Sequence, residues 1–163
     1  MITVTLPYPV SANRYWSHRT VKPKSGPSFT TTFLTAEAKA YKADVKHLLY
    51  ASGVHKAMEG RVRIDIVLYA KRPLDWQKRQ RQYGAEWDNT VQRIDLDNAR
   101  KCVYDSLKEL AFQDDFWVWK DSGEVGEPDA HGARVVVRIS SASLAQPQAG
   151  LDLVVPAVDP LEA

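Results

Sequence analysis

The clearest secondary-structure signal in the chain is the stretch RVRIDIVLYA at residues 61–70. Apolar side chains alternate there with mostly charged or polar ones, the apolar set being Val62, Ile64, Ile66, Leu68 and Ala70. A period of two places alternate side chains on one face of an extended strand. The stretch therefore predicts a β-strand with one face in a hydrophobic core.

Two further segments repeat this alternation. Ile2, Val4 and Leu6 alternate with threonines, and an apolar alternation returns over residues 135–139. Both segments predict strands. Residues 10–34 are polar and we interpret them as a long loop, while residues 71–94 lack a clear period. Long loops in small domains are often functional.

Two helices are expected between the strands. The first begins at Ala36 behind Thr35 as its N-cap and ends at Gly53 or Gly60. The second runs from about Asp97 to Leu110. Its continuous stripe of apolar or small side chains comprises Ala99, Cys102, Val103, Ser106, Leu107 and Leu110. The order β, α, β, α, β predicts an α+β fold, with a small mixed or antiparallel sheet packed against two main helices.

The chain has 163 residues, which fits one domain. We expect that domain to span residues 1–140. Residues 141–163 are rich in Ala, Pro, Gln and Asp and are interpreted as a mobile C-terminal tail.

A single cysteine, Cys102, excludes an intramolecular disulfide and a cysteine metal cluster, which suits the reducing cytoplasm. Its place on the apolar stripe favours a buried structural residue over a nucleophile. The N-terminus lacks the pattern of a signal peptide, and no apolar stretch approaches the roughly 18–20 residues of a membrane span. A cytoplasmic protein without a membrane partner is therefore expected.

The net charge of +2 is divided unevenly along the chain. Residues 1–93 carry 16 Lys and Arg against 7 Asp and Glu, whereas residues 94–163 carry 6 against 13. The first part is thus +9 and the second −7. Chance would explain this division, and so would a polyanion-binding surface around a carboxylate site that holds cations.

The strongest chemical motif is Asp95-Leu96-Asp97-Asn98, followed by Lys101. An Asp-x-Asp pair in extended geometry directs both carboxylates to one side, and here it stands at the start of the second helix. Lys101 follows Asp97 by four residues and so lies on the same helix face. A second acidic pair, Asp114-Asp115, comes just after the helix and could return to the same site.

Clustered carboxylates repel one another, and a hard divalent cation such as Mg²⁺ relieves that cost. Such a site fits metal-assisted hydrolysis of a phosphodiester, with a nearby lysine stabilising the transition state. The alternative is structural. Asp97 would then only cap the helix and form a surface ion pair with Lys101, and Asp114-Asp115 would only form a turn.

Two segments are candidates for DNA binding. Residues 71–94 combine cations with Trp76, Tyr83 and Trp87, and residues 11–19 combine Asn, Arg and aromatic side chains. Cations contact phosphates, and aromatic rings stack on unpaired bases. Alternatively, the first segment is only a solvated loop, and the second is a loop held to the core by its aromatics. The candidate contacts are Asn13, Arg14, Tyr15, Lys71, Arg72, Lys78, Arg79, Arg81 and Arg93.

In these motifs the chain resembles the RusA family of Holliday-junction resolvases, crossover junction endodeoxyribonucleases of bacteria and their prophages. The resemblance begins in Thr3–Pro9 and Asn13-Arg14-Tyr15 and continues through Thr35–Tyr41. It is most specific from Asp95 onward. The positions that carry it there are Asp95, Leu96, Asp97, Asn98, Lys101, Asp105, Leu107, Phe112, Asp114 and Asp115.

The resemblance implies a homodimeric, Mg²⁺-dependent endonuclease, with Mn²⁺ as an alternative ion, that makes paired nicks in four-way junction DNA during recombination and repair. The family's metal-binding aspartates fall on Asp95, Asp97 and Asp115, with the adjacent Asp114 as a further candidate ligand. The catalytic lysine falls on Lys101, so the implied catalytic set is Asp95, Asp97, Lys101 and Asp115.

The chain departs from the family pattern in four places. Phe116-Trp117 stands where a polar pair usually follows the double aspartate, and residues 73–92 form a longer segment. Ile94 follows Arg93 where some members are basic up to the first aspartate, and the tail has no counterpart. Two other functions stay open. One is a non-enzymatic nucleic-acid-binding protein, and the other is a metal-dependent phosphohydrolase acting on small phosphoesters.

Overall fold

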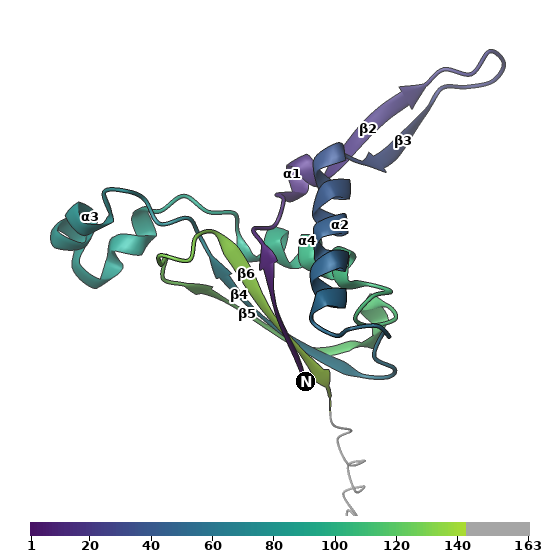
Figure 1. Ribbon diagram of the computed structural model, residues 1–163. Coiled ribbons are helices and arrows are strands. Elements are labelled where there is room, and N and C mark those ends of the chain that lie inside the picture. Colours follow the sequence, from purple (N-terminus) through teal and green to yellow (C-terminus); the bar gives the residue numbers. More distant parts are fainter. Residues whose placement is uncertain (143–163) are drawn as a thin grey trace, which may run out of the picture.

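A mixed four-stranded sheet organises the computed structural model, which describes residues 1–142 (Figure 1). The sheet contains β1 (Ile2–Pro7), β4 (Val62–Tyr69), β5 (Val118–Gly126) and β6 (Arg134–Ser141) in the order β1-β6-β4-β5. β4 pairs with β5 in parallel, and β6 pairs antiparallel with both β1 and β4. The predicted α+β fold with a mixed sheet is confirmed.

The strand at residues 61–70 forms the centre of the core, as its alternation predicted. Val62, Ile64, Ile66 and Leu68 are at most 1% exposed. The register places Ile64 opposite Ile139 and Leu68 opposite Val135 on β6. Cross-strand apolar pairs on one face are the unit that stabilises such a sheet.

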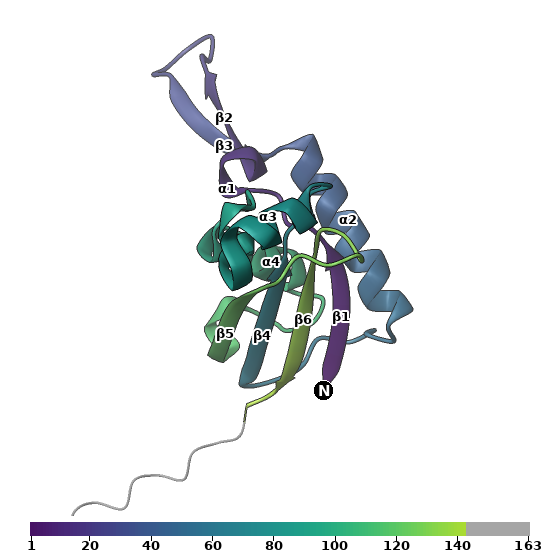
Figure 2. The same cartoon turned by 90° about the vertical axis from the view of Figure 1, so that its left-hand side faces the viewer.

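Two helices, α2 (Ala36–Ala51) and α4 (Leu96–Leu107), pack on this apolar face (Figures 1 and 2). α2 begins where predicted, because Thr35 Oγ1 accepts a hydrogen bond from the Ala38 N–H at 3.2 Å. α4 ends at Leu107, three residues before the predicted end. The chain cannot continue the helix there, since Glu109 adopts a left-handed conformation with φ of 67°.

The interpretation of residues 10–34 as one long loop is wrong. They contain the short helix α1 (Ala12–Tyr15) and a hairpin of β2 (Trp16–Val21) and β3 (Phe29–Leu34), which projects from the body in Figure 1. The Thr35 N–H donates to the Tyr15 carbonyl at 3.1 Å and closes the base of the hairpin. Both hairpin faces are largely exposed, so its sequence carries no apolar alternation.

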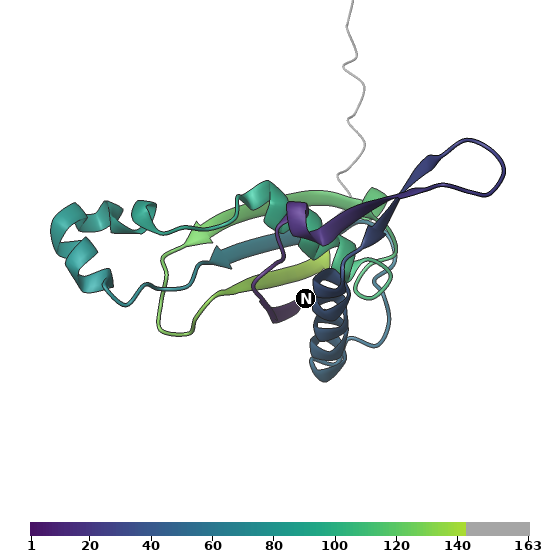
Figure 3. The same ribbon diagram turned by 90° about the horizontal axis from the view of Figure 1, so that it is seen from above.

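Residues 71–94 are also more ordered than their sequence suggests. They form α3 (Trp76–Tyr83) and the 3₁₀ helix η1 (Gly84–Thr90). A second small apolar cluster of Ala70, Trp87 and Val91, with Trp76 against it, holds them together. Figure 3 shows this α3–η1 unit and the β2–β3 hairpin at opposite ends of the molecule.

The strand β5, which begins at Val118, was not predicted from the sequence. The 3₁₀ helix η2 (Asp115–Trp117) leads directly into β5. β5 is an edge strand with mostly exposed side chains, which explains why it lacks the period of a half-buried strand. The predicted tail falls almost entirely on residues 143–163, outside the described residues. Among residues 1–142, no helix is long and apolar enough to cross a membrane.

A substitution of Phe112 tests how much the turn after α4 contributes to the stability of the core. Its ring is fully buried and meets Tyr104 edge to face at a centroid distance of 6.4 Å. We expect Phe112→Ala to lower the free energy of unfolding by about 3–5 kcal/mol, since it leaves a cavity. Chemical denaturation measures this.

The matched control is Phe116→Ala, because Phe116 is 74% exposed only four residues later. It should change the free energy of unfolding by less than about 0.5 kcal/mol. Equal effects of the two substitutions would contradict the described packing.

Candidate functional site

A cavity of about 740 Å³ lies beside the polar face of α4. Its walls come from α1, the start of β2, α4, η2 and the first half of β5. Lys101 of α4 and Asp115 of η2 both line it. The fold thus brings a cation and a carboxylate, 14 positions apart in the sequence, to one concave site.

The other two acidic candidates stand at the N-terminus of the same helix. Asp95 is the N-cap, and its Oδ1 accepts from the Asn98 N–H at 2.8 Å while Oδ2 accepts from the Asn98 amide at 2.6 Å. Asp97 lies in the first turn with a side chain that is 82% exposed. Asp95 and Asp97 do not line the cavity. They stand at the start of the helix that carries Lys101, but not on the cavity wall to which Lys101 belongs.

Asp114 differs from its neighbour Asp115. It caps η2, with Oδ1 accepting from the Phe116 N–H at 3.1 Å, and its Oδ2 lies 2.7 Å from Lys108 Nζ. The hydrogen bond from Lys108 and that from the Phe116 backbone lower the pKa of Asp114. Asp114 is therefore engaged in local structure, whereas Asp115 faces the cavity.

Carboxylate oxygens are the donors that a hard divalent cation prefers, and Mg²⁺ commonly uses only one or two of them with water and phosphate oxygens. Asp95, Asp97 and Asp115 match that donor chemistry. Within residues 1–142, however, no three His, Cys, Asp or Glu side chains are grouped closely enough to hold an ion by themselves. The chemistry of the donors fits the metal, and a preassembled three-carboxylate cluster is absent from the described residues.

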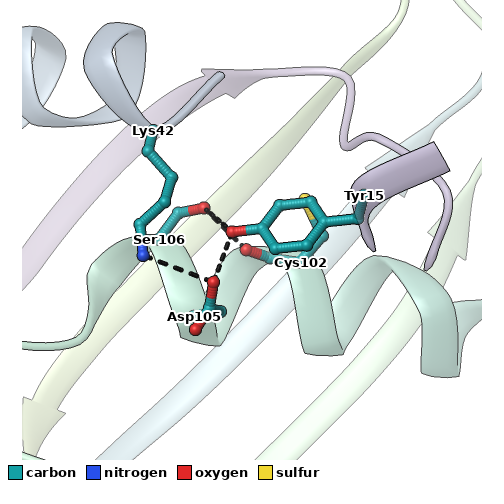
Figure 4. Close-up of polar contacts among 5 residues, drawn as sticks. All are labelled: Tyr15, Lys42, Cys102, Asp105 and Ser106. Atoms are coloured by element: carbon teal, nitrogen blue, oxygen red, sulfur yellow. Dashed lines mark hydrogen bonds and ion pairs between the residues drawn. The ribbon is translucent and has the colours of Figure 1, made fainter. Parts of the chain in front are cut away.

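One wall of the cavity is fixed by a polar network between α1, α2 and α4 (Figure 4). The Tyr15 hydroxyl donates to Asp105 Oδ2 and lies 3.5 Å from Ser106 Oγ, and Lys42 Nζ donates to the same carboxylate oxygen at 3.3 Å. Burial and the hydrogen bond to Asp105 raise the pKa of Tyr15, so the phenol keeps its proton and donates. Tyr15, a candidate DNA contact, is 2% exposed, and its hydroxyl is bonded to Asp105.

The wall toward β5 contains a second group that the sequence did not indicate. Tyr104 donates a hydrogen bond to Asp121 Oδ2 at 3.1 Å, and Arg100 Nε lies 3.0 Å from that oxygen as an ion pair without hydrogen-bond geometry. Burial raises the pKa of Tyr104. Helical spacing of three residues from Asp97 and Lys101 could have placed Arg100 and Tyr104 on this helix face. Asp121 lies on β5, a strand that the sequence did not predict.

Cys102 of α4 is also among the cavity-lining residues, but it is only 3% exposed. Burial raises the pKa of its thiol to about 12, so the thiolate that a nucleophile needs is suppressed. The structural interpretation of Cys102 therefore fits its position in the core.

The remaining predicted DNA contacts divide by location. Asn13 and Arg14 are exposed on α1, where Arg14 pairs with Glu37 at 3.3 Å. On the α3–η1 unit, Arg79 is held by Asp75 and Thr90, and Arg72 lies over the Trp76 ring at 4.7 Å. The remaining cations, exposed and without an ion pair to the described residues, are Lys71, Lys78, Arg81 and Arg93.

A double-mutant cycle tests the network of Figure 4. Tyr15→Phe and Asp105→Asn should each destabilise the chain, with a coupling energy of about 1 kcal/mol, because the two groups share one hydrogen bond. Paired denaturation curves of the single and double variants measure it. Strictly additive effects would show that the hydroxyl and the carboxylate act independently.

Comparison with known protein families identifies the family of this chain. The family model described as endodeoxyribonuclease RusA matches residues 7–140, which include every candidate residue on α1, α3, α4 and η2. No curated protein matches the sequence. Since the match covers most of the 163 residues, the chain belongs to the RusA family of endodeoxyribonucleases, the Holliday-junction resolving nucleases.

Proposed function

We propose that this RusA-family nuclease resolves four-way DNA junctions by paired, Mg²⁺-dependent cleavage, with Mn²⁺ as an alternative ion, in recombination and repair in the cytoplasm. The observation that supports it is the placing of Lys101 and Asp115 on one cavity, beside a helix that begins with Asp95 and Asp97. Cation and carboxylates of this kind suit phosphodiester hydrolysis.

In this proposal Asp95, Asp97 and Asp115 hold the divalent cation, which supplies Lewis acidity at the scissile phosphate when bound. Asp114 is a weaker candidate, because Lys108 already occupies one of its oxygens. The Lys101 ammonium offers three N–H donors to the phosphate and stabilises the charge that develops on it and on the leaving oxygen. The Tyr15–Asp105 and Tyr104–Asp121 contacts hold α4, and with it Lys101, against the neighbouring elements.

Paired cleavage requires two sites. A homodimer with a two-fold axis matches the symmetry of a four-way junction, so each copy would cut one strand. The cations of the α3–η1 unit, with Asn13 and Arg14, are proposed to bind the arms through their phosphates.

The direct test is incubation of a synthetic four-way junction with the protein and Mg²⁺. We expect paired nicks near the branch. Asp97→Asn should lower the cleavage rate at least about 100-fold, as removal of one active-site electrostatic group commonly does, and leave junction binding intact.

Asp44→Asn is the matched control, since Asp44 is an exposed aspartate on α2 away from the cavity, and it should cleave like the wild type. Junction binding without nicking in Mg²⁺ or Mn²⁺ would support a non-enzymatic binding protein instead. Hydrolysis of small phosphoesters with intact junctions would support a phosphohydrolase.

The basic α3–η1 unit has its own test. Removing the exposed cations Lys78 and Arg81 together should weaken binding and reduce the slope of log affinity against log salt by about 1.8, as expected for two lost phosphate contacts. Lys56→Ala serves as control, because Lys56 is paired with Glu59 at 2.8 Å outside that unit. Salt titrations that leave the slope unchanged in the double variant would exclude this surface.

A further inference from the structure

The cavity beside α4 has a feature that phosphodiester cleavage does not use. Two half-exposed indoles line it together with Lys101 and Asp115. Trp16 is 44% exposed at the start of β2, and Trp119 is 53% exposed at the start of β5. Large aromatic rings left half exposed in a concave site indicate a ligand with a flat, apolar face.

Trp119 is held in place. The Arg61 guanidinium carbon lies 3.5 Å from the centroid of the indole ring and covers one of its faces. The backbone of Arg61 is held just before β4 begins, because its carbonyl accepts from the Ala142 N–H at 2.8 Å. Arg61 therefore restricts the indole ring from one side, and the same ring lines the cavity.

Trp16 is also held in place by contacts with neighbouring residues. It meets the buried Tyr15 edge to face at a centroid distance of 5.4 Å, and the Tyr15 hydroxyl is bonded to Asp105 on α4. In the hairpin, Trp16 pairs with Leu34 next to the closing hydrogen bond from Thr35. Both indoles thus project from the anchored ends of their strands.

The rest of the cavity combines charged and apolar side chains and is of suitable size. Its volume of about 740 Å³ lies within the roughly 300–1,000 Å³ of pockets that hold drug-sized ligands. Lys101 and Lys120 line the cavity without an ion pair to the described residues and suit a phosphate, whereas Arg100 is already paired with Asp97 and Asp121. Aromatic, cationic and hydrogen-bonding groups together match a nucleotide.

We propose that this cavity receives one unpaired nucleobase of the strand bound at Lys101 and Asp115, stacked on Trp119 and contacted by Trp16. The inference rests on the proposed nuclease function. A base in a regular duplex is stacked on both faces and cannot enter without an unstacking cost, which is smallest for a base already unpaired. The cavity therefore favours DNA whose bases are unstacked near the cut, such as the branch of a junction.

A second protein chain is a less suitable occupant. The cavity is continuous with the candidate catalytic residues Lys101 and Asp115, and a base is joined to its phosphate through one sugar. Lys101 and Lys120, which form no ion pair with the described residues, also line the walls and favour a phosphodiester over an apolar protein surface. Binding of a second copy is kept as an outcome of the test.

Photocrosslinking tests the proposal without cleavage. A four-way junction carrying 5-iodouracil at single positions near the branch is bound to the wild-type chain in EDTA, irradiated and mapped by mass spectrometry. We expect crosslinks to Trp119 or Trp16 from a base at the branch and none from a base deep within an arm. Crosslinks confined to other residues would overturn the proposal.

Three variants give a second readout through junction affinity in EDTA. Trp119→Ala should weaken binding by about 5- to 150-fold, the range for one base–aromatic stack, and Trp119→Phe should restore most of it. Tyr50→Ala is the control, because Tyr50 is a 44% exposed aromatic on α2 outside the cavity, and its affinity should match the wild type. Circular dichroism verifies folding, and the wild-type crosslink does not depend on any variant.

The outcomes separate this proposal from the nuclease proposal. Junction cleavage without a crosslink to either indole contradicts the nucleobase site alone. A crosslink without cleavage in Mg²⁺ or Mn²⁺ contradicts the nuclease function alone. Unchanged junction affinity of Trp119→Ala overturns the nucleobase site. A change in the sedimentation of this variant from dimer to monomer without DNA also overturns it, and assigns the cavity to a second copy of the chain.

Discussion

The burial of one face of α4 is the constraint on which the candidate site depends. Ala99, Val103 and Leu107 are fully buried, and the helix contacts α1, α2, β4 and β5. At about 25 cal/mol per Å² of apolar surface, such burial fixes the rotation of the helix far more firmly than its exposed ion pairs can. The opposite face must then present Lys101 and its polar neighbours to the cavity.

Elements with one buried face were predictable, and those without were not. Alternation identified β1, β4 and β6, and the stripe with its caps identified α2 and α4. β5 and the β2–β3 hairpin were not predicted, because most of their side chains are exposed. β5 also pairs with β4, which is far from it in the sequence. α3 buries none of its residues and owes its position to a small cluster around Trp87.

The same distinction applies to the site. Local spacing predicts that Asp95, Asp97 and Lys101 share one helix, as they do, but only Lys101 lines the cavity. Asp115 required the chain to return after α4, which the turn at residues 108–114 accomplishes through the left-handed Glu109. The indoles could not be foreseen, since Trp16 and Trp119 meet the cavity only through the packing of α1 and β5 on α4. Tyr15 illustrates the converse, because a residue that resembled a DNA contact by composition is buried against Asp105.

We propose that the carboxylates at the start of α4 and on η2 serve one metal-dependent site. Iron-directed cleavage of the protein itself tests whether they do. With Fe²⁺, ascorbate and peroxide, hydroxyl radicals formed at a bound ion cut the nearby backbone. We expect cuts near residues 95–97 and near Asp115, both suppressed by excess Mg²⁺. Cuts in only one of these regions, or cuts that Mg²⁺ does not suppress, would contradict a shared site.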